Sequence, residues 1–479
     1  MAQSPTHLKQ PLYAQIAQGL AQLIDDGLFK SGARLPSVRA MATQHGVSIS
    51  TAVQAFHWLE ERNLIVARPK SGYFVANRAK GLALPSVSRP PKYSLPVQMQ
   101  SRTAQIAVED ESNYRVSFGG ACPKDAKLFD PDRVRVALSR ATRTHRLTLV
   151  EFTDSDGTLA LKQAVVQRAW HLGCRLDAAN VVISASCMHA VSMCLQAVTQ
   201  PGDIVAMESP THFGFLDLLE SLSLRALEIP THPKDGMSLS ALQLALDTQP
   251  IKAVLSVPTL SNPLGAVMKS ADKKALVQLL TRHQVPLIED VVCNDLLTSD
   301  ERRKAAKSFD EQGFVMLCGS FSKTVTPGVR IGWCEAGRWK EKVARLKQVH
   351  GIPTPHVLEY ALADLLTQRG YEVGLRRLSS VLKNRLDQAR EIISNSFPTG
   401  TRVSRPVSGY TLWVELPEKF NATELFKQCA EQGILFAPGA LFTATDRFKH
   451  CLRLSFAGQW RELERQALRE IGDIAKNAA

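Results

Sequence analysis

The sequence predicts an α/β protein in which a small N-terminal domain precedes a larger domain built on a mainly parallel sheet. Three observations support this fold class. Residues 9–76 contain three short amphipathic patterns and then two apolar runs. Residues 77–112 are rich in Pro and Ser and show no sustained periodicity. From residue 113 onward, β-branched runs alternate with helical patterns that are long enough for crossover helices.

The N-terminal domain, residues 1–76, is expected to contain three helices and a hairpin. Apolar residues recur at helical spacing between Leu12 and Ile24, and Ser37 and Ser48 can cap two further short helices. Two apolar runs then flank a basic turn at residues 68–72. Three helices and a hairpin in this order indicate a winged helix-turn-helix.

Residues 77–112 are expected to form a linker, extended in part. The larger domain then covers residues 113–479, with a smaller subdomain from about residue 360 to the end. Crossover helices are expected at 187–199 and 271–284, and strands at 181–183, 203–207, 253–257, 286–288, 314–317, 411–414 and 451–454.

The composition excludes several other classes of protein. With 44% hydrophobic and 22% charged residues, the chain is neither globally disordered nor fibrous. It has no apolar run of about 18 residues that would span a membrane, and its N-terminus lacks the layout of a secretory signal. Nine scattered cysteines without a C-x-x-C pair favour a reducing compartment. We therefore expect a cytoplasmic protein with no metal site.

The formal net charge of +13 is concentrated near the N-terminus. Residues 1–100 contain 11 Lys and Arg against 4 Asp and Glu, whereas the other 379 residues contain 47 against 41. A compact basic domain ahead of a nearly neutral one suits a nucleic-acid-binding head on a larger effector domain. A solvated basic face explains the same numbers, so charge alone does not decide between the two.

The third predicted helix is the candidate for contact with DNA bases, because the start of the second helix of the motif meets base edges. Its first residues carry hydroxyls that can bond phosphates or bases, and arginine and lysine side chains nearby can bind phosphates. The alternative is a helical dimerisation domain whose charges are only solvated. The candidate DNA-binding residues are Arg39, Ser48, Ser50, Thr51, Arg68 and Lys70.

Five separated features of the larger domain point to one cofactor, pyridoxal phosphate. The first is Lys323, which lies among small hydroxyl residues including Ser320 and Ser322 and can form a Schiff base. Arg330, seven residues later, can clamp a phosphate. The second is Asp290 at the end of an apolar strand, where a buried carboxylate can pair with a protonated pyridine nitrogen. A helix cap is the alternative for this carboxylate.

Three further features complete the set. Asn262 follows the apolar run 253–257 and can donate to the pyridoxal hydroxyl, although an ordinary Asn-Pro turn explains it too. The residues from Ser186 to Met188 lead from a strand into a helix, whose free backbone N–H groups can hold a phosphate. Arg453 lies inside a predicted strand and suits a ligand carboxylate. Each feature has an ordinary explanation when taken singly, but the five in this order favour a cofactor site.

Both domains resemble known families. The N-terminal motifs resemble the GntR winged-helix family over most of residues 10–76, and the five features resemble the fold-type I aminotransferases over roughly 113–479. A GntR-like head joined to such a body resembles the MocR subfamily of bacterial regulators. The head motifs are Pro11-Leu12-Tyr13-Ala14-Gln15-Ile16, Gly32-Ala33-Arg34-Leu35-Pro36-Ser37-Val38-Arg39, Val47-Ser48-Ile49-Ser50-Thr51-Ala52-Val53 and Arg68-Pro69-Lys70-Ser71-Gly72-Tyr73.

The resemblance implies binding of double-stranded DNA through the position of Arg39 and the recognition helix, pyridoxal phosphate in the body, and homodimers. It implies that Lys323 forms the Schiff base, that Asp290 meets the pyridine nitrogen and that Asn262 meets the ring hydroxyl. The remaining implied contacts are to phosphate from Ser320, Ser322 and Arg330, to the cofactor from Ser186, Cys187, Met188 and His212, and to a substrate carboxylate from Arg453.

The sequence also departs from the resemblance. Many relatives have a tyrosine on the ring hydroxyl where this chain has Cys293, and Phe152 replaces a tyrosine that often reaches the partner subunit's phosphate. His212 stands where an aromatic ring commonly stacks on the cofactor, and Ser186 replaces a frequent glycine. Each lost hydroxyl bond costs about 1 kcal/mol of cofactor binding, and none of the changes removes the Schiff base.

Two functions from different classes fit the sequence. The first is a DNA-binding transcriptional regulator whose body binds pyridoxal phosphate and senses an amine or amino-acid effector. The alternative is a pyridoxal-phosphate-dependent aminotransferase with an accessory DNA-binding head. The basic winged helix and the lost tyrosines favour the regulator. A third reading, a DNA-binding protein with an inert body, is opposed by the joint presence of Lys323, Asp290, Asn262, Arg330 and Arg453.

Overall fold

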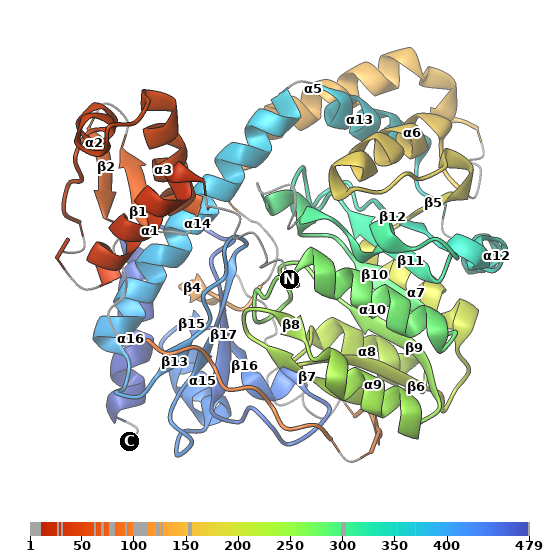
Figure 1. Ribbon diagram of the computed structural model, residues 1–479. Helices are drawn as coiled ribbons and strands as arrows, with labels where there is room; N and C mark the ends of the chain where they lie inside the picture. The colour runs from red at the N-terminus through yellow and green to blue at the C-terminus, as the bar shows by residue number, and fades with distance from the viewer. Residues whose placement is uncertain are drawn as a thin grey trace, which may run out of the picture. The chain divides into compact units, whose positions relative to one another are not determined.

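The computed structural model divides into two compact units, which we call the head (within residues 1–80) and the body (within residues 81–479). Figure 1 draws the head in red and orange and most of the body in yellow to blue. The structure describes residues 11–25, 28–29, 32–61, 64–68, 71–75, 82–91, 93–98, 113–120, 125, 128–151, 156–297, 303–351, 353–368 and 370–477.

The head contains three helices and a hairpin, in the order that the sequence predicts. Ser37 and Ser48 cap the second and third helices, and their hydroxyls accept hydrogen bonds from the backbone N–H groups of Ala40 at 3.2 Å and Thr51 at 3.1 Å. Gly46 ends the second helix with a φ of 62°, a left-handed conformation that suits glycine. The elements are α1 (Leu12–Asp25), α2 (Val38–His45), α3 (Ile49–Glu61), β1 (Ile65–Arg68) and β2 (Gly72–Val75).

A small apolar core holds the head together. Ile16 and Leu20 of α1 pack with Phe56 and Leu59 of α3 and with Ile65 of β1, and all five side chains are buried. These positions lie on the inner faces that the amphipathic spacing predicts. The recognition helix α3 is therefore fixed by packing on α1 and on the hairpin.

The body is built on a sheet whose path runs β3-β7-β6-β9-β10-β11-β12-β5, with β8 paired to β7. The five strands from β7 to β11 in this path are parallel to one another, whereas β3 runs antiparallel to β7, and β12 runs antiparallel to both β11 and β5. The strands are β3 (Leu95–Pro96), β5 (Val181–Ser184), β6 (Ile204–Ser209), β7 (Arg225–His232), β8 (Gly236–Met237), β9 (Ile251–Ser256), β10 (Leu287–Asp290), β11 (Val315–Ser320) and β12 (Gly332–Glu335).

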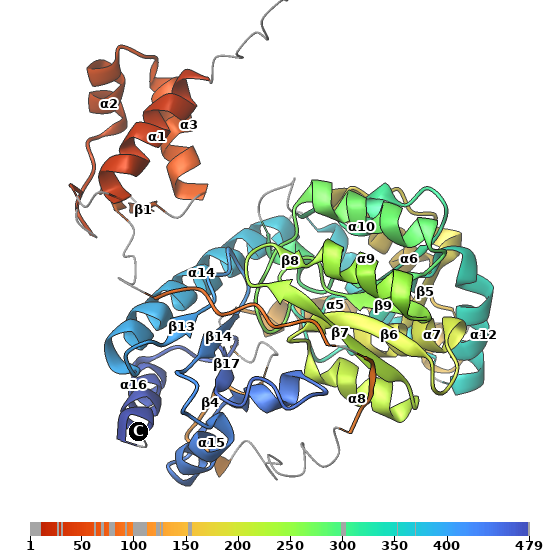
Figure 2. The same cartoon turned by 60° about the horizontal axis from the view of Figure 1, so that its bottom comes forward.

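Helices cover both faces of this sheet (Figures 1 and 2). One apolar cluster joins the sheet to α7 (Cys187–Val198), α8 (Phe213–Ser221) and α12 (Lys340–His350). Two further clusters join the opposite face to α6 (Leu159–Ala169), α9 (Leu239–Thr248), α10 (Ser270–Arg282) and α13 (His356–Thr367), and α5 (Pro131–Thr144) packs on α13. The parallel strands are thus buried on both sides, as their near-continuous apolar runs predict.

The C-terminal subdomain has its own sheet, in the order β13-β14-β17-β16, and its own apolar core. Its elements are α14 (Gly370–Ser396), β13 (Arg402–Val403), β14 (Thr411–Glu415), α15 (Ala422–Glu431), β15 (Ile434–Leu435), β16 (Ala437–Pro438), β17 (Cys451–Ser455) and α16 (Glu462–Asn477), with β4 (Val116–Ser117) paired to β15. Turns of 3-10 helix lie at Arg146–Leu149, Trp170–Leu172, Ala178–Asn180, Asn294–Leu296, Ala306–Phe309, Gly337–Trp339 and Gly439–Phe442.

Part of the predicted linker packs on the body as extended chain. The backbone N–H and the hydroxyl of Ser86 both donate to the Glu415 carboxylate, at 2.6 and 2.8 Å, and Val403 donates to the carbonyl of Ala83 at 2.9 Å. Strand β3 then joins the edge of the main sheet beside β7. The proline-rich composition explains the lack of a helix here, but not these contacts.

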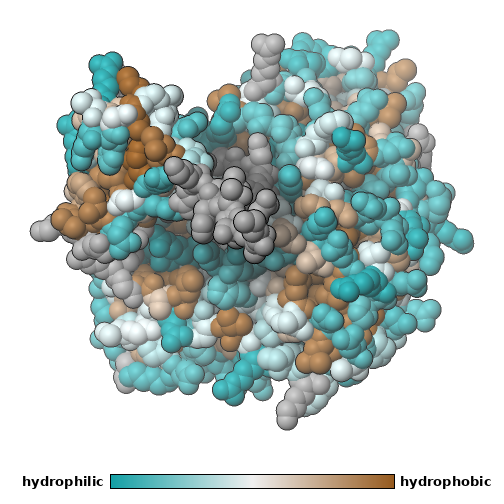
Figure 3. Space-filling view, viewed as in Figure 1, coloured by the Kyte–Doolittle hydropathy of each residue, from teal (hydrophilic) through white to brown (hydrophobic). Residues whose placement is uncertain are grey.

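The predicted fold class is confirmed: a winged helix-turn-helix precedes an α/β body with a mainly parallel sheet and a smaller C-terminal subdomain. Strands are present at the seven predicted runs and helices at both predicted crossovers, with shifts of a few residues at their ends. The face drawn in Figure 3 mixes hydrophilic and hydrophobic side chains. Within the described residues, no helix combines the length and apolar character that crossing a membrane requires.

Candidate functional site

Three polar side chains predicted to hold a cofactor follow three neighbouring strands of the body sheet. Asn262 follows β9, Asp290 is the last residue of β10, and Lys323 follows β11. These strands are adjacent and parallel, so their carboxyl ends lie at one edge of the sheet. Ligands of open parallel sheets bind at this edge.

The carboxylate of Asp290 is buried at the start of this site. It accepts hydrogen bonds from the backbone N–H of Val292 at 2.8 Å and from the thiol of Cys187. Burial raises the pKa of Asp290 to about 6, although these two bonds and the charge of Lys323 act in the opposite direction. A nearby cation would therefore stabilise the ionised form of this carboxylate.

The amide of Asn262 is partly satisfied within the protein. Its Nδ2 lies 3.3 Å from Nδ1 of His212, whereas its Oδ1 is buried and has no hydrogen-bond partner among the described residues. Buried amide atoms without a partner are rare. One polar atom of the Asn262 amide can therefore bond a ligand, whether that atom is the oxygen or the nitrogen.

His212 precedes α8 and forms part of the same site. Its ring packs edge-on against Phe213 and Phe215, with centroids 4.9 and 5.3 Å apart. Burial, together with the positive charges of Arg453 and Lys323, lowers the pKa of His212 to about 3. The ring is thus neutral near pH 7 and can stack on another flat ring.

Lys323 lies in the turn after β11 and is half-buried. Its Nζ is 5.9 Å from the centroid of the Tyr410 ring, and its charge acts on both Asp290 and His212. The hydroxyls of Ser320 and Ser322 are 3.4 Å apart on either side of Phe321, and both serines are buried. The lysine and the two hydroxyls are thus part of one tight turn.

The start of α7 is held directly against the sheet. Ser186 caps the helix by accepting from the His189 N–H at 3.1 Å, and Cys187 and Met188 form its first turn. Gly332 of β12 lies beneath this turn, and a Cβ there would come within 2.6 Å of the Cys187 nitrogen. A helix start of this kind presents backbone N–H groups and a positive dipole end, which together bind anions.

Arg453 reaches the site from the C-terminal subdomain. It lies in β17, is fully buried, and donates to the carbonyl of Gly119. Its guanidinium carbon is 5.3 Å from the centroid of Phe442 and 5.9 Å from that of Phe213. Because its charge also lowers the pKa of His212, Arg453 belongs to the same electrostatic environment as Lys323.

The remaining residues that the sequence singled out for the cofactor site differ in how far they are buried. Arg330 is exposed and has a φ of 51°, and Met188 is half-buried. Cys293 is buried, and its Sγ is 3.6 Å from the hydroxyl of Tyr410. Phe152 lies outside the described residues.

Sequence reasoning missed two tyrosines near the lysine turn. Tyr410 contacts Cys293 and lies over Lys323. The hydroxyl of Tyr371 is 3.1 Å from the Asp295 carboxylate and 3.2 Å from the hydroxyl of Thr324, the residue after the lysine. Neither tyrosine is part of a local motif, and only its position in the fold reveals it.

The predicted base-reading residues lie at the exposed start of α3. The hydroxyl of Ser48 is 2.8 Å from the hydroxyls of both Ser50 and Thr51, so the three form one cluster. Ile49 between them is 55% exposed, as an apolar contact with a thymine methyl group requires. Both kinds of group that read bases are thus present at this helix start.

The residues predicted to contact phosphates lie only partly within the described part of the chain. Arg39 is exposed on α2, the helix that precedes the recognition helix. Arg68 ends β1, and its side chain and Lys70 lie outside the described residues. An exposed arginine on the helix before α3 suits the arrangement in which flanking groups bind phosphates while the next helix meets the bases.

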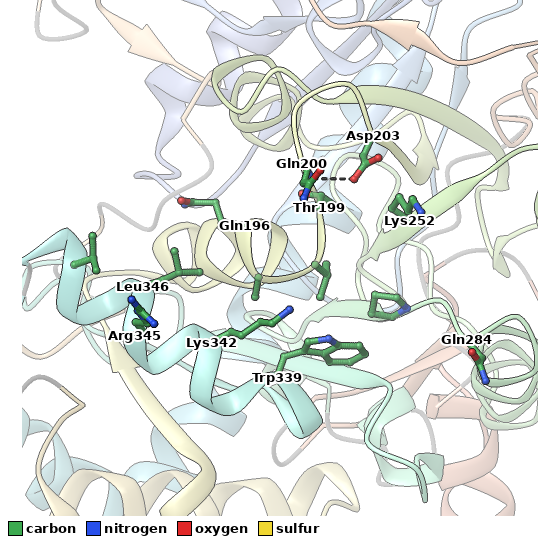
Figure 4. A pocket seen from close by; sticks show the side chains of 14 residues that line it. Gln196, Thr199, Gln200, Asp203, Lys252, Gln284, Trp339, Lys342, Arg345 and Leu346 are labelled. Atoms are coloured by element: carbon green, nitrogen blue, oxygen red, sulfur yellow. Dashed lines mark hydrogen bonds between the residues drawn. The ribbon is translucent and has the colours of Figure 1, made fainter.

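A cavity of about 810 Å³ lies elsewhere on the body, between the end of α7 and α12 (Figure 4). Lys252, Lys342 and Arg345 line it together with Trp339. Asp203 on its rim accepts from the backbone N–H of Gln200 at 2.8 Å. None of the predicted site residues lines this cavity, so cavity size does not identify the functional site.

The fold and site together define a class of protein, a regulator-type winged helix joined to an aminotransferase-type body. Residues 119–471 match the family model for aminotransferase class I and II, and residues 12–75 match the model for bacterial regulatory proteins of the gntR family. The chain belongs to the class I and II aminotransferase family and carries a GntR-family head, which is the MocR-like architecture.

Similar proteins share this two-domain arrangement. The uncharacterized HTH-type transcriptional regulator YjiR of Escherichia coli K12 is 33% identical over 466 residues, which cover 97% of this chain and 99% of YjiR. The uncharacterized HTH-type transcriptional regulator YdcR of the same organism is 35% identical over 462 residues, which cover 96% and 98%. Both domains are therefore matched within single relatives.

The body also resembles solved aminotransferase structures. The crystal structure of LysN, an alpha-aminoadipate aminotransferase from Thermus thermophilus, superposes with a TM-score of 0.71 at 24% identity. The match covers 76% of this chain and 92% of LysN. At this level of identity the likeness shows the fold of the body.

Proposed function

We propose that this protein is a transcriptional regulator that binds double-stranded DNA through its head and pyridoxal phosphate through its body. The observation that carries the proposal is the presence of both sites on one chain. The exposed start of α3 has hydroxyl and apolar groups of the kinds that can read DNA, and Asn262, Asp290 and Lys323 lie at the carboxyl edge of the body sheet. An enzyme that only turns over a metabolite does not need the first of these sites.

The residues at the sheet edge fit pyridoxal phosphate. Asp290 is a buried carboxylate whose ionised form a pyridinium would stabilise. The Oδ1 atom of Asn262 is buried and has no hydrogen-bond partner among the described residues. Lys323 is the amine that an aldehyde would bind. When bound, this cofactor supplies an electron-withdrawing ring that accepts electron density from a bound amine.

The other groups around Lys323 would hold the phosphate and the ring of the cofactor. The start of α7 at Ser186–Met188 and the hydroxyls of Ser320 and Ser322 would hold the phosphate, and Arg330 would add its charge. The neutral ring of His212 would stack on the pyridine ring. These roles follow from the anion-binding character of a helix start and from the neutrality of His212.

An amine or amino acid is the effector that suits this body. Arg453 is fully buried within the C-terminal subdomain and its charge acts on His212 at the site. A carboxylate matches the fork of a guanidinium better than any neutral group does. The amino group of the same ligand would then face Lys323 and the cofactor aldehyde.

A homodimer also suits the surface of the body. Leu147, Leu149 and Val150 are 60%, 57% and 84% exposed, one after another along a short segment. A run of exposed large apolar side chains marks a surface that associates with another protein. A second copy of this chain would cover it.

One set of variants tests both sites at once. Purified protein with added pyridoxal phosphate should absorb visible light, and Lys323→Ala should lose this absorbance yet still bind the DNA fragments that the protein occupies in cells. Arg39→Ala should retain the absorbance and bind those fragments about tenfold more weakly, because one charged phosphate contact is lost. Arg135→Ala, which removes an exposed arginine of the body, should change neither.

The outcomes separate the proposal from its alternative. A colourless wild-type protein that ignores added cofactor would refute the body assignment. Unchanged DNA binding by Arg39→Ala and by the Ser50/Thr51 double alanine variant would refute the placement of the recognition helix. If no DNA fragment is enriched with the protein in cells, an aminotransferase with an accessory head becomes the better description.

A further inference from the structure

One edge of the proposed cofactor site is formed by the residues that follow Asp290 at the end of β10. Cys293 follows Asp290 closely and is buried at this edge. Burial raises the pKa of the Cys293 thiol to about 11, although the bond to Tyr410 and the charge of Lys323 act in the opposite direction. The group is therefore a neutral thiol, which is a weak hydrogen-bond donor.

A phenol from the other subdomain occupies the same edge. Tyr410 precedes β14, is 6% exposed, and places its hydroxyl 3.6 Å from the Cys293 Sγ. The same ring lies 5.9 Å from Nζ of Lys323. Its hydroxyl thus lies beside the thiol, and its ring borders the amine that would bind the cofactor.

The segment that carries Tyr410 is fixed by contacts on both sides. Ser408 donates to the carbonyl of Leu296 at 2.7 Å, and the Tyr410 carbonyl accepts from the Phe456 N–H at 2.7 Å. Gly265, in the loop after Asn262, packs so closely that an added Cβ would lie 2.5 Å from Cβ of Pro406. The position of the phenol is therefore set by the fold rather than by a freely moving loop.

We propose that Tyr410 donates the hydrogen bond to the ring hydroxyl oxygen of pyridoxal phosphate that Cys293 is too weak a donor to supply. This inference rests on the proposed function, since it requires the cofactor at Lys323. In pyridoxal the ring oxygen is attached next to the carbon that bears the aldehyde. A partner of that oxygen must therefore lie near Lys323, and Tyr410 does so, in addition to Asn262, which the resemblance places on the same oxygen.

The hydrogen bond has a measurable consequence. A phenol that donates to the ring oxygen stabilises its anionic form, so the nitrogen attached to the cofactor gives up its proton at a lower pH. The other titratable or charged groups that act on Lys323 or its neighbours are Asp290, His212, Cys293 and Arg453. All four residues are retained in a Tyr410→Phe variant, and Cys293 stays a neutral thiol because the lost bond to Tyr410 had lowered its pKa. A change in the titration therefore reports the lost hydroxyl.

The experiment is a spectrophotometric titration of the holoprotein between pH 5 and 10. Tyr410→Phe should move the midpoint of the visible band toward alkaline pH by roughly one unit, the tenfold change expected for one charge-assisted hydrogen bond. The control Tyr360→Phe alters a tyrosine of α13 that stacks on His145, and it should leave the midpoint unchanged. Circular dichroism checks that each variant is folded.

A second pair of variants locates the donor. Cys293→Ala should leave the midpoint unchanged, whereas Cys293→Tyr added to Tyr410→Phe should move it back toward the wild-type value. If Tyr410→Phe fails to retain the cofactor, recovery of the visible band by the double variant supports the proposal and continued loss overturns it.

The failures are distinguishable. A wild-type protein without a visible band overturns both the proposed function and this inference. A wild-type band whose midpoint is the same in Tyr410→Phe overturns only the inference, as does a shift produced by Cys293→Ala alone, because the thiol would then be the donor.

Discussion

Asp290→Asn should make the cofactor-free protein more stable at neutral pH. The change removes one charge but keeps an oxygen that accepts from the Val292 N–H, which is 2.8 Å away in the wild type. Burial raises the pKa of Asp290 from 3.8 to about 6, so ionising this side chain opposes folding. Under the proposed function, the wild-type body would tolerate this cost because the carboxylate pairs with a pyridine nitrogen.

The size and sign follow from proton linkage. Between pH 3.8 and about 6 the folded protein binds more protons at Asp290 than the unfolded chain does, so wild-type stability falls as the pH rises through this interval. At about 1.4 kcal/mol for each pH unit, the cost is roughly 3 kcal/mol at pH 8 and roughly half of that at pH 5. It becomes small at pH 4 and disappears below about pH 3, where Asp290 is protonated in both states.

Urea unfolding of the cofactor-free protein, followed by tryptophan fluorescence, measures this difference at pH 8, 5 and 4. Asp290→Asn should exceed the wild type by the amounts given, and the gap should close as the pH falls. The control Asp473→Asn changes a carboxylate that is 66% exposed and should show no such pH dependence. Equal stabilities at pH 8, or a gap that is the same at all three values, would refute the reasoning.

Two further predictions concern the head and the surface of the body. Phe56→Ala should destabilise the head by about 3–5 kcal/mol, because Phe56 is fully buried in its core. DNA binding should be lost in an anisotropy assay, while the visible band of the cofactor remains. Loss of both DNA binding and the visible band would contradict the independence of the two units. The double variant Leu149→Glu with Val150→Asp should be a monomer in light scattering, whereas the wild type should be a dimer. Leu244→Glu changes another exposed site and should leave the dimer intact. A monomeric wild type would contradict the proposed dimer.

The residues at the sheet edge could be predicted because each follows an apolar run. Asp290 ends such a run, and Asn262 and Lys323 come after two others. In a parallel sheet the ends of neighbouring strands meet, so three positions far apart in the sequence come together. The same logic places the serine-capped start of α7 against Gly332. Local pattern and strand direction were sufficient for these positions.

Tyr410 and the packed part of the linker could not be predicted in this way. Tyr410 lies 117 residues after Cys293, and their contact depends on how the C-terminal subdomain docks on the sheet. Ser86 binds Glu415 across a separation of 329 residues. Neither contact leaves a periodic pattern, because each depends on a single side chain or on backbone groups.

The two parts of the body contribute different kinds of group to one site. The main sheet supplies Asn262, Asp290 and Lys323, whereas the C-terminal subdomain supplies Arg453 on β17 and Tyr410 just before β14. Strands β14 and β17 are paired along their whole length, with Trp413 opposite Arg453. A carboxylate that binds Arg453 therefore acts on the same ladder that carries Tyr410.

Under the proposed function, this arrangement would link effector binding to the state of the cofactor. If the effector binds more tightly in the position of the ladder that also brings Tyr410 to the ring oxygen, the cofactor must in turn raise effector affinity by the same factor. A ligand without a carboxylate would miss Arg453 and so lose this coupling, however well its amine reached Lys323. Added amino acids should therefore change the titration midpoint of the visible band. Simple amines that remain unbound to the cofactor should leave the midpoint constant. This comparison measures the coupling without any assay of DNA binding.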